Sequence, residues 1–230
     1  KKKNWKNYKE NGTNYDGYDP ITGLPYARKF PTDFVSHAWR CDFAELVNAL
    51  EEEHTNRILQ LPYKQAVQER SVTRYYWNDI FVEDQNTSDK KPDGYFFNAF
   101  RTAVQTIGRT VLVLEQLRGS VALTRAWCIW EIFCTAEKNI DLVVTMPSNE
   151  RRVFEDMVLR NDGMAELIQC LKRVDSANSN SFKLEDKEEI QRIVEKEFGQ
   201  NGFQEVDEKI RAALQAWLQR KLAGPAPLLL

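Results

Sequence analysis

Runs of apolar residues and helically spaced apolar positions alternate along the middle of the chain. A strand that is covered on both faces of a parallel sheet reads as a continuous apolar run, and such runs occur at residues 34–36, 110–114 and 142–144. Helically spaced apolar residues follow each run. The alternation predicts a flavodoxin-like, doubly wound α/β fold, with a parallel sheet of four or five strands and helices on both faces. We expect the strand at 33–36 in the centre of the sheet, with the strand at 110–114 beside it.

Local signals set the expected boundaries of these elements. The apolar spacing from residue 43 predicts a helix of about ten residues, and the aromatic-rich residues 75–81 favour a second strand. The polar stretch 83–93 is expected to be a loop. The helix that follows should end at Gly108, because glycine commonly closes helices.

The chain divides into four segments. Residues 1–32 are expected to form an extended arm, and residues 33–160 the α/β domain itself. Residues 161–222 begin with an apolar segment around Leu167, read as either a last edge strand or a helical turn, and continue with two amphipathic helices. The apolar stripes of these helices predict a C-terminal helical extension packed on the domain, with a surface for a partner helix as the alternative. Residues 223–230 show no pattern and are expected to be a tail.

Composition narrows the class of protein. The 230 residues are 42% hydrophobic and 29% charged, which are the proportions of a globular chain. The net charge of −2 gives no reason to expect nucleic acid as a partner. No apolar run is long enough to cross a bilayer, so no membrane association is expected. Four cysteines without C-x-x-C spacing are typical of reduced, buried thiols and favour a cytoplasmic location.

The common catalytic motifs of α/β enzymes are missing from the sequence. It contains no G-x-G-x-x-G after a strand, no G-x-x-x-x-G-K-[ST], no H-E-x-x-H and no G-x-S-x-G. Two histidines in the whole chain exclude a histidine-rich metal site, and we expect neither a metal nor a cofactor. The most familiar α/β enzyme classes are thereby removed from consideration.

The predicted helix at 124–138 carries a single charge in an apolar setting. It reads Ala-Trp-Cys-Ile-Trp-Glu-Ile-Phe-Cys-Thr-Ala from Ala126 to Ala136, and Glu131 is the only charged residue in that stretch. Burial raises the pKa of a carboxyl group unless a partner compensates it. Glu131 is therefore either a functional group with a perturbed pKa or one half of a structural ion pair, for instance with Arg101 or Arg109.

The sequence around this helix resembles the TIR (Toll/interleukin receptor) domain family. Plant-type members have a buried strand, a short loop and then a helix of the form Ser-x-Trp-Cys-Leu-x-Glu-Leu. This chain reads Arg-Thr-Val-Leu-Val-Leu-Glu at 109–115 and Leu-Thr-Arg-Ala-Trp-Cys-Ile-Trp-Glu-Ile at 123–132. Residues 33–36 are similar to the opening strand of the family, and residues 77–79 to its second strand. The likeness is greatest to the divergent TIR-like domains of algae and protists, and it covers residues 33–158.

The resemblance implies an activity and a site. In enzymatic TIR domains the glutamate of this helix is required for cleavage of NAD⁺, and here it falls on Glu131. Sheets of this kind bind ligands at the carboxyl ends of their strands. The residues expected to bind the substrate NAD⁺ are His37, Trp39, Arg40, Asp79 and Trp127. Trp39 is expected either to stack on a ring of the ligand or simply to pack in the core, and Arg40 to meet phosphate.

The resemblance leaves two functions from different classes open. The first is an NAD⁺ nucleosidase that releases nicotinamide and either ADP-ribose or a cyclic isomer, and is activated by self-association in signalling or immunity. The second is a non-catalytic signalling module that acts by homotypic assembly. The presence of Glu131 favours the enzyme, whereas Ala38 stands where many TIR enzymes carry an arginine and favours the module. Sensing of a nucleotide without turnover is a third possibility.

Overall fold

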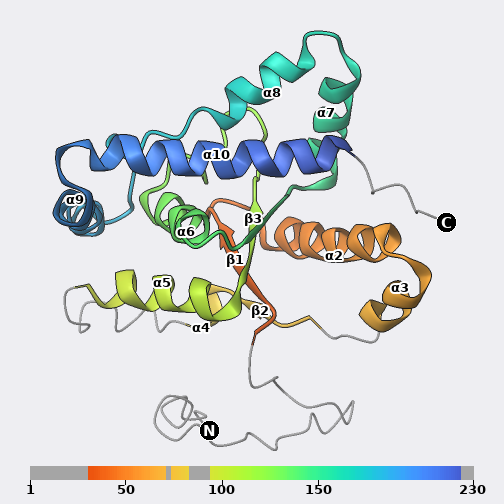
Figure 1. The fold of residues 1–230 in the computed structure, drawn as a ribbon, viewed down its shortest axis with the longest axis horizontal. Coiled ribbons are helices and arrows are strands. Elements are labelled where there is room, and N and C mark those ends of the chain that lie inside the picture. Colours follow the sequence, from red (N-terminus) through yellow and green to blue (C-terminus); the bar gives the residue numbers. More distant parts are fainter. Residues whose placement is uncertain (1–30, 71–73, 83–93, 224–230) are drawn as a thin grey trace, which may run out of the picture.

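A four-stranded parallel sheet forms the centre of the chain, as the apolar pattern predicts (Figure 1). The computed structural model describes residues 31–70, 74–82 and 94–223. The strands follow the order β2-β1-β3-β4, and they are β1 (Asp33–His37), β2 (Tyr76–Trp77), β3 (Arg109–Val113) and β4 (Asp141–Thr145). β1 and β3 pair with each other at the centre, in the register Phe34 to Thr110. Both the central position of β1 and its neighbour are therefore confirmed.

Helices cover both faces of this sheet, which confirms the doubly wound class. On one face, Val35, Val111 and Val113 pack against Leu46 and Leu50 of helix α2 (Phe43–Gln60). On the other face, strand residues such as Phe34 and Leu112 belong to a larger apolar cluster. The helices that contribute to this cluster include α5 (Tyr95–Ile107), α6 (Ala126–Glu137) and α10 (Gly202–Ala223).

The aromatic strand expected over residues 75–81 is shorter than predicted. β2 ends at Trp77, and a short helix, α4 (Asp79–Val82), begins two residues later. The side chain of Asn78 explains the change of direction, because its Oδ1 accepts a hydrogen bond from the backbone N–H of Ile80 at 3.0 Å. Phe81, which suggested a strand, has an exposed side chain in α4.

α2 is longer than its apolar spacing predicts, because it has 18 residues where about ten were expected. The carboxylate of Asp42 caps its start by accepting hydrogen bonds from the backbone N–H groups of Ala44 and Glu45. Its buried residues Leu46, Ala49 and Leu50 all lie in the first half, so the second half has no apolar stripe for periodicity to detect. The helix ends just before Pro62, and α3 (Tyr63–Arg70) follows.

One expected helix boundary is confirmed and one open alternative is resolved. α5 ends at Gly108, which adopts the left-handed conformation with a φ of 76°. α7 (Ser148–Leu159) starts directly after Pro147. The segment around Leu167 is helix α8 (Gly163–Leu171), not an edge strand.

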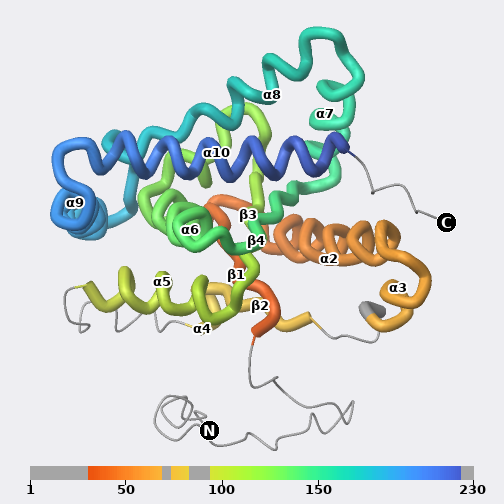
Figure 2. Tube along the Cα trace, in the orientation of Figure 1, coloured from red at the N-terminus to blue at the C-terminus, as the bar shows by residue number. Residues whose placement is uncertain are grey.

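The two C-terminal helices share the core of the sheet. Ile210 and Trp217 of α10 are buried, and Ile193 and Phe198 of α9 (Leu184–Phe198) pack against the same apolar cluster. The ring of Phe198 lies 5.3 Å from that of Phe133 in α6. Figure 2 shows α10 running lengthwise past α6, with α9 at one end.

Some expectations lie outside the described residues, namely the arm up to residue 30, the loop at 83–93 and the tail after Ala223. None of the helices in the described part combines the length and the apolar character that a membrane-spanning helix requires.

Candidate functional site

The carboxyl group of Glu131 lies in the middle of α6 and faces β1. The residue is 5% exposed, and the Oγ of Ser36 in β1 donates a hydrogen bond of 2.6 Å to its Oε2. This contact exists because Ser36 and Phe34 alternate onto the face of the sheet that α6 covers. Glu131 is thus held near the carboxyl end of a central strand, where doubly wound sheets place their ligands.

The surroundings of Glu131 oppose its ionisation. Burial is the largest cause, followed by the nearby charge of Asp79, and together they raise the pKa of Glu131 to about 8. The hydrogen bond from Ser36 and the charge of Arg125 act in the opposite direction, to lower that pKa. The carboxyl group therefore titrates near neutral pH, which is unusual for glutamate.

Neither arginine that was considered as an ion-pair partner of Glu131 has this role. Arg101 pairs with Glu197, at 2.8 Å between Nη2 and Oε2. Arg109 pairs with Asp33 and Glu53 at the opposite end of β1. Within the part of the chain that the structure describes, Glu131 forms no salt bridge, and its carboxylate hydrogen bond comes from a neutral hydroxyl.

Three of the predicted substrate-binding residues come together at the carboxyl ends of β1 and β2. The Nε1 of Trp39 donates a hydrogen bond of 2.8 Å to Oδ2 of Asp79, and Nδ1 of His37 lies 4.0 Å from Oδ1 of the same carboxylate. β1 and β2 are parallel neighbours in the sheet, so the side chains that follow their carboxyl ends lie close together. Burial lowers the pKa of His37 despite the opposing charge of Asp79, so the imidazole is neutral at pH 7.

Arg125 joins this group from the start of α6. It is the residue immediately before the helix, and its guanidinium carbon lies 4.7 Å from the centre of the Trp39 ring, within the range of a cation–π contact. Trp39 is 46% exposed, so the alternative in which it simply packs in the core is wrong. An exposed indole with a cation on its ring is suited to a flat or anionic ligand.

The other two predicted binding residues lie elsewhere. Trp127 donates from Nε1 to Oδ2 of Asp186 in α9 at 3.0 Å, and its ring packs against Phe96 and Phe100 of α5. It belongs to an aromatic cluster between helices. Arg40 follows Trp39 in the chain but is exposed on the surface.

Sequence reasoning missed three participants: Ser36, Arg125 and Cys128, whose Sγ donates to the backbone carbonyl of His37 at 3.2 Å. For Ser36 the available signal was a hydroxyl inside an otherwise apolar strand. For Arg125 it was a cation one residue before the apolar helix. Neither signal specifies a partner, because the contacts cross 95 and 86 positions of the chain, from Ser36 to Glu131 and from Trp39 to Arg125.

The described residues include no group of three or more histidine, cysteine, aspartate or glutamate side chains placed to hold a metal ion. No protein-family model, no curated protein and no solved structure matches the chain.

Proposed function

We propose that this chain is a TIR-like NAD⁺ nucleosidase with Glu131 as its catalytic residue. The observation that carries the proposal is a buried carboxyl group that has no salt bridge among the described residues and accepts from a neutral hydroxyl. Burying such a group lowers the stability of the fold, and a functional role explains why it is present. It also lies in the helix where the TIR pattern has its catalytic glutamate.

The reaction needs one negative charge and no general acid. The bond between the ribose C1′ and the pyridinium nitrogen breaks, and its electron pair leaves with nicotinamide, which becomes neutral. The ribose is left as an oxocarbenium-like cation, which the carboxylate of Glu131 stabilises through space. Water then attacks C1′ and releases a proton to give ADP-ribose, or a hydroxyl elsewhere in the same cation attacks C1′ and releases its proton to give a cyclic isomer.

The neighbouring side chains have complementary roles in this proposal. Trp39 offers an exposed ring for stacking, and Arg125 offers a guanidinium fork for a phosphate of the dinucleotide. Arg125 thereby supplies a cation at a site where Ala38 replaces the usual arginine. Because Glu131 is buried, entry of the substrate requires a rearrangement, which we assign to the stacked pair of Trp39 and Arg125.

The alternative function is a non-catalytic module that acts by homotypic assembly. One observation favours it, namely a group of exposed apolar side chains beside the candidate site. We call this group the apolar rim, and it consists of Phe43, Ile80, Phe81 and Val82. The rings of Phe43 and Phe81 lie 5.7 Å apart in an edge-to-face pair, and exposed apolar patches of this kind mark interaction surfaces.

Release of nicotinamide distinguishes the two functions. The purified chain is incubated with NAD⁺ at high protein concentration, and nicotinamide is measured by liquid chromatography. The enzyme should release it, and Glu131→Ala should abolish the release. Glu137→Gln is the matched control, because this carboxylate is in the same helix but pairs with Arg101 at 3.6 Å. No release from the wild-type chain would rule out the nucleosidase and leave the assembly module.

A further inference from the structure

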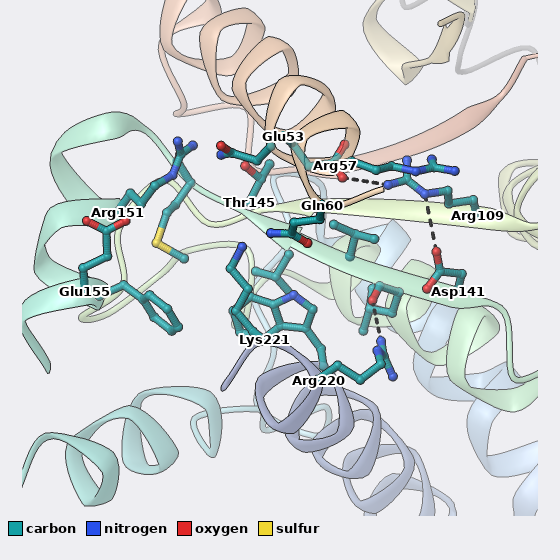
Figure 3. A pocket seen from close by; sticks show the side chains of 17 residues that line it. Glu53, Arg57, Gln60, Arg109, Asp141, Thr145, Arg151, Glu155, Arg220 and Lys221 are labelled. Carbon is teal, nitrogen blue, oxygen red and sulfur yellow. Dashed lines mark hydrogen bonds and ion pairs between the residues drawn. The ribbon is translucent and has the colours of Figure 1, made fainter. Parts of the chain in front are cut away.

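A pocket of about 550 Å³ runs along the outer edge of β4, away from the candidate site. Its walls come from α2 on one side and from α7 and α10 on the other (Figure 3). β4 is an edge strand in the described sheet. Leu142 directs its carbonyl outward to Arg220, whereas Thr145 directs its carbonyl inward to Leu114. Because the backbone N–H and C=O groups of successive residues point to opposite sides of a strand, those of Val144 also face the pocket.

At the end of the pocket beside the first residues of β4, the charged side chains are already paired with one another. There the guanidinium group of Arg109 meets three carboxylates, those of Asp33, Glu53 and Asp141. Asp33 is fully buried and Arg109 nearly so. Charges that are paired in this way hold the ends of β1, β3 and α2 together, and they leave little for a ligand to bind.

The end formed by α10 is different, because its cations have no acidic partners among the residues that the structure describes. Arg220 donates to a neutral group, the backbone carbonyl of Leu142, at 3.0 Å. Lys221 forms neither a hydrogen bond nor an ion pair with the residues that the structure describes. In Figure 3, Lys221 from α10 and Gln60 from α2 point toward one another across the pocket. Five cationic and three acidic side chains line the pocket in all, so its surplus of positive charge gathers at this end.

The rest of the lining at this end suits a small organic anion. Trp217 and Phe154 line the pocket with their rings 5.8 Å apart, and together they provide an apolar wall. Pockets that bind small molecules have this volume and combine an apolar lining with a few converging polar groups. Guanidinium and ammonium groups with unused donors favour phosphate, because this group carries up to two negative charges and three oxygen atoms that accept hydrogen bonds.

We propose that this pocket binds a small phosphorylated molecule, with the phosphate held by Arg220 and Lys221 and the organic part against Trp217. The pocket shares no residue with the group around Glu131, so this proposal does not rest on the nucleosidase activity.

Nuclear magnetic resonance of the full chain labelled with ¹⁵N tests the proposal. The indole N–H signal of Trp217 is identified by its loss in Trp217→Phe. Adenosine monophosphate, adenosine and inorganic phosphate are then titrated separately. We expect saturable movement of this signal with adenosine monophosphate, and weaker binding by about tenfold or more for adenosine, which lacks the charge. Inorganic phosphate alone should compete for the same site.

Arg220→Gln with Lys221→Gln should weaken the binding of adenosine monophosphate by about tenfold or more. Both side chains are exposed, so the variant should fold. Arg152→Gln with Lys196→Gln is the matched control, because it removes two exposed cations that do not line the pocket. If the two cations only shield the open edge of β4, the Trp217 signal will not move with any phosphate probe, and the pocket variant will instead self-associate. That result would overturn the proposal, as would equal binding by the pocket and control variants.

Discussion

Glu131 combines a buried position with a neutral hydrogen-bond donor, and this combination has a measurable consequence for stability. The pKa of Glu131 in the folded chain is raised to about 8 from an ordinary value of 4.5. Between these two values the folded chain holds a proton that the unfolded chain has lost. The contribution of Glu131 to the free energy of unfolding is therefore fully present below pH 4.5, and it is lost as the pH rises to about 8.

Glu131→Gln should remove this dependence, because the amide stays neutral at every pH. We expect the wild type and the variant to have similar free energies of unfolding at pH 5. At pH 9 the variant should be the more stable, by up to roughly 5 kcal/mol for a shift of this size. Urea denaturation at the two pH values measures the difference. A structural ion pair would give the reverse order, with the variant less stable at pH 9.

The same substitution should separate activity from stability. Glu131→Gln keeps the shape of the side chain and loses its charge, so turnover of NAD⁺ should fall by about two to three orders of magnitude. Initial rates of nicotinamide release measure it, with circular dichroism as the check on folding. A loss of less than about tenfold would mean that the charge of Glu131 is not the source of catalysis.

The pH dependence of the wild-type rate should report the ionisation of Glu131. In the proposed mechanism the carboxylate is the active form, so kcat/KM should rise with pH and level off above about 8. The cationic pyridinium of bound NAD⁺ favours the carboxylate, so kcat should level off at a lower pH than kcat/KM. Rates measured between pH 6 and pH 9 test this. A rate that falls over the whole range would assign Glu131 to proton donation instead.

At the scale of elements, the sequence predicts the helices and strands that carry a regular pattern of apolar residues. β1, β3, β4, α5 and α6 each carry a strong apolar pattern, and each occurs close to where it is expected. β2 is predicted from its aromatic residues but ends earlier than expected, because the side chain of Asn78 turns the chain by a hydrogen bond. The second half of α2 carries no apolar pattern, because it buries no side chain. The same limit applies to the site, where Glu131 stands out as a charge in an apolar helix but its partners do not.

The C-terminal helices supply a prediction at this scale, because their apolar stripes and the sheet share one core. Truncation after residue 180 removes α9 and α10 and uncovers Phe133, which is fully buried. We expect the truncated chain to aggregate, since the exposed surface is large and apolar. Size-exclusion chromatography and thermal melting measure this. A monomeric product with unchanged melting would show that the two helices are an independent appendage.

At the scale of the whole molecule, the two regions of interest lie at different parts of one sheet. The group around Glu131 gathers at the carboxyl ends of β1 and β2, whereas the basic pocket follows the outer edge of β4. β3 lies between β1 and β4 in the sheet, and it is buried along its full length. A ligand at one region therefore does not contact a ligand at the other, and the two proposals are open to separate tests.

Self-association is the remaining expectation, and the apolar rim gives it a location. Phe43 and Phe81 are exposed and lie on α2 and α4, which start just beyond the carboxyl ends of β1 and β2. A second copy docked there would cover Trp39 and exclude water from the carboxylate, which strengthens its effect on the ribosyl cation. Nicotinamide release per protomer should then increase with protein concentration. Phe81→Ser should weaken association and lower this rate at a fixed concentration.

Phe182→Ser is the control for this change, because Phe182 is a similarly exposed ring outside the rim. Sedimentation velocity gives the association state of each variant, and the release assay gives its rate. The pH-dependent difference in stability between Glu131 and its glutamine variant should persist in the Phe81→Ser background, since it arises within one copy. Equal association of the Phe81→Ser and Phe182→Ser variants would place the contact elsewhere. A rate per protomer that does not change with concentration would show that each copy carries a complete site.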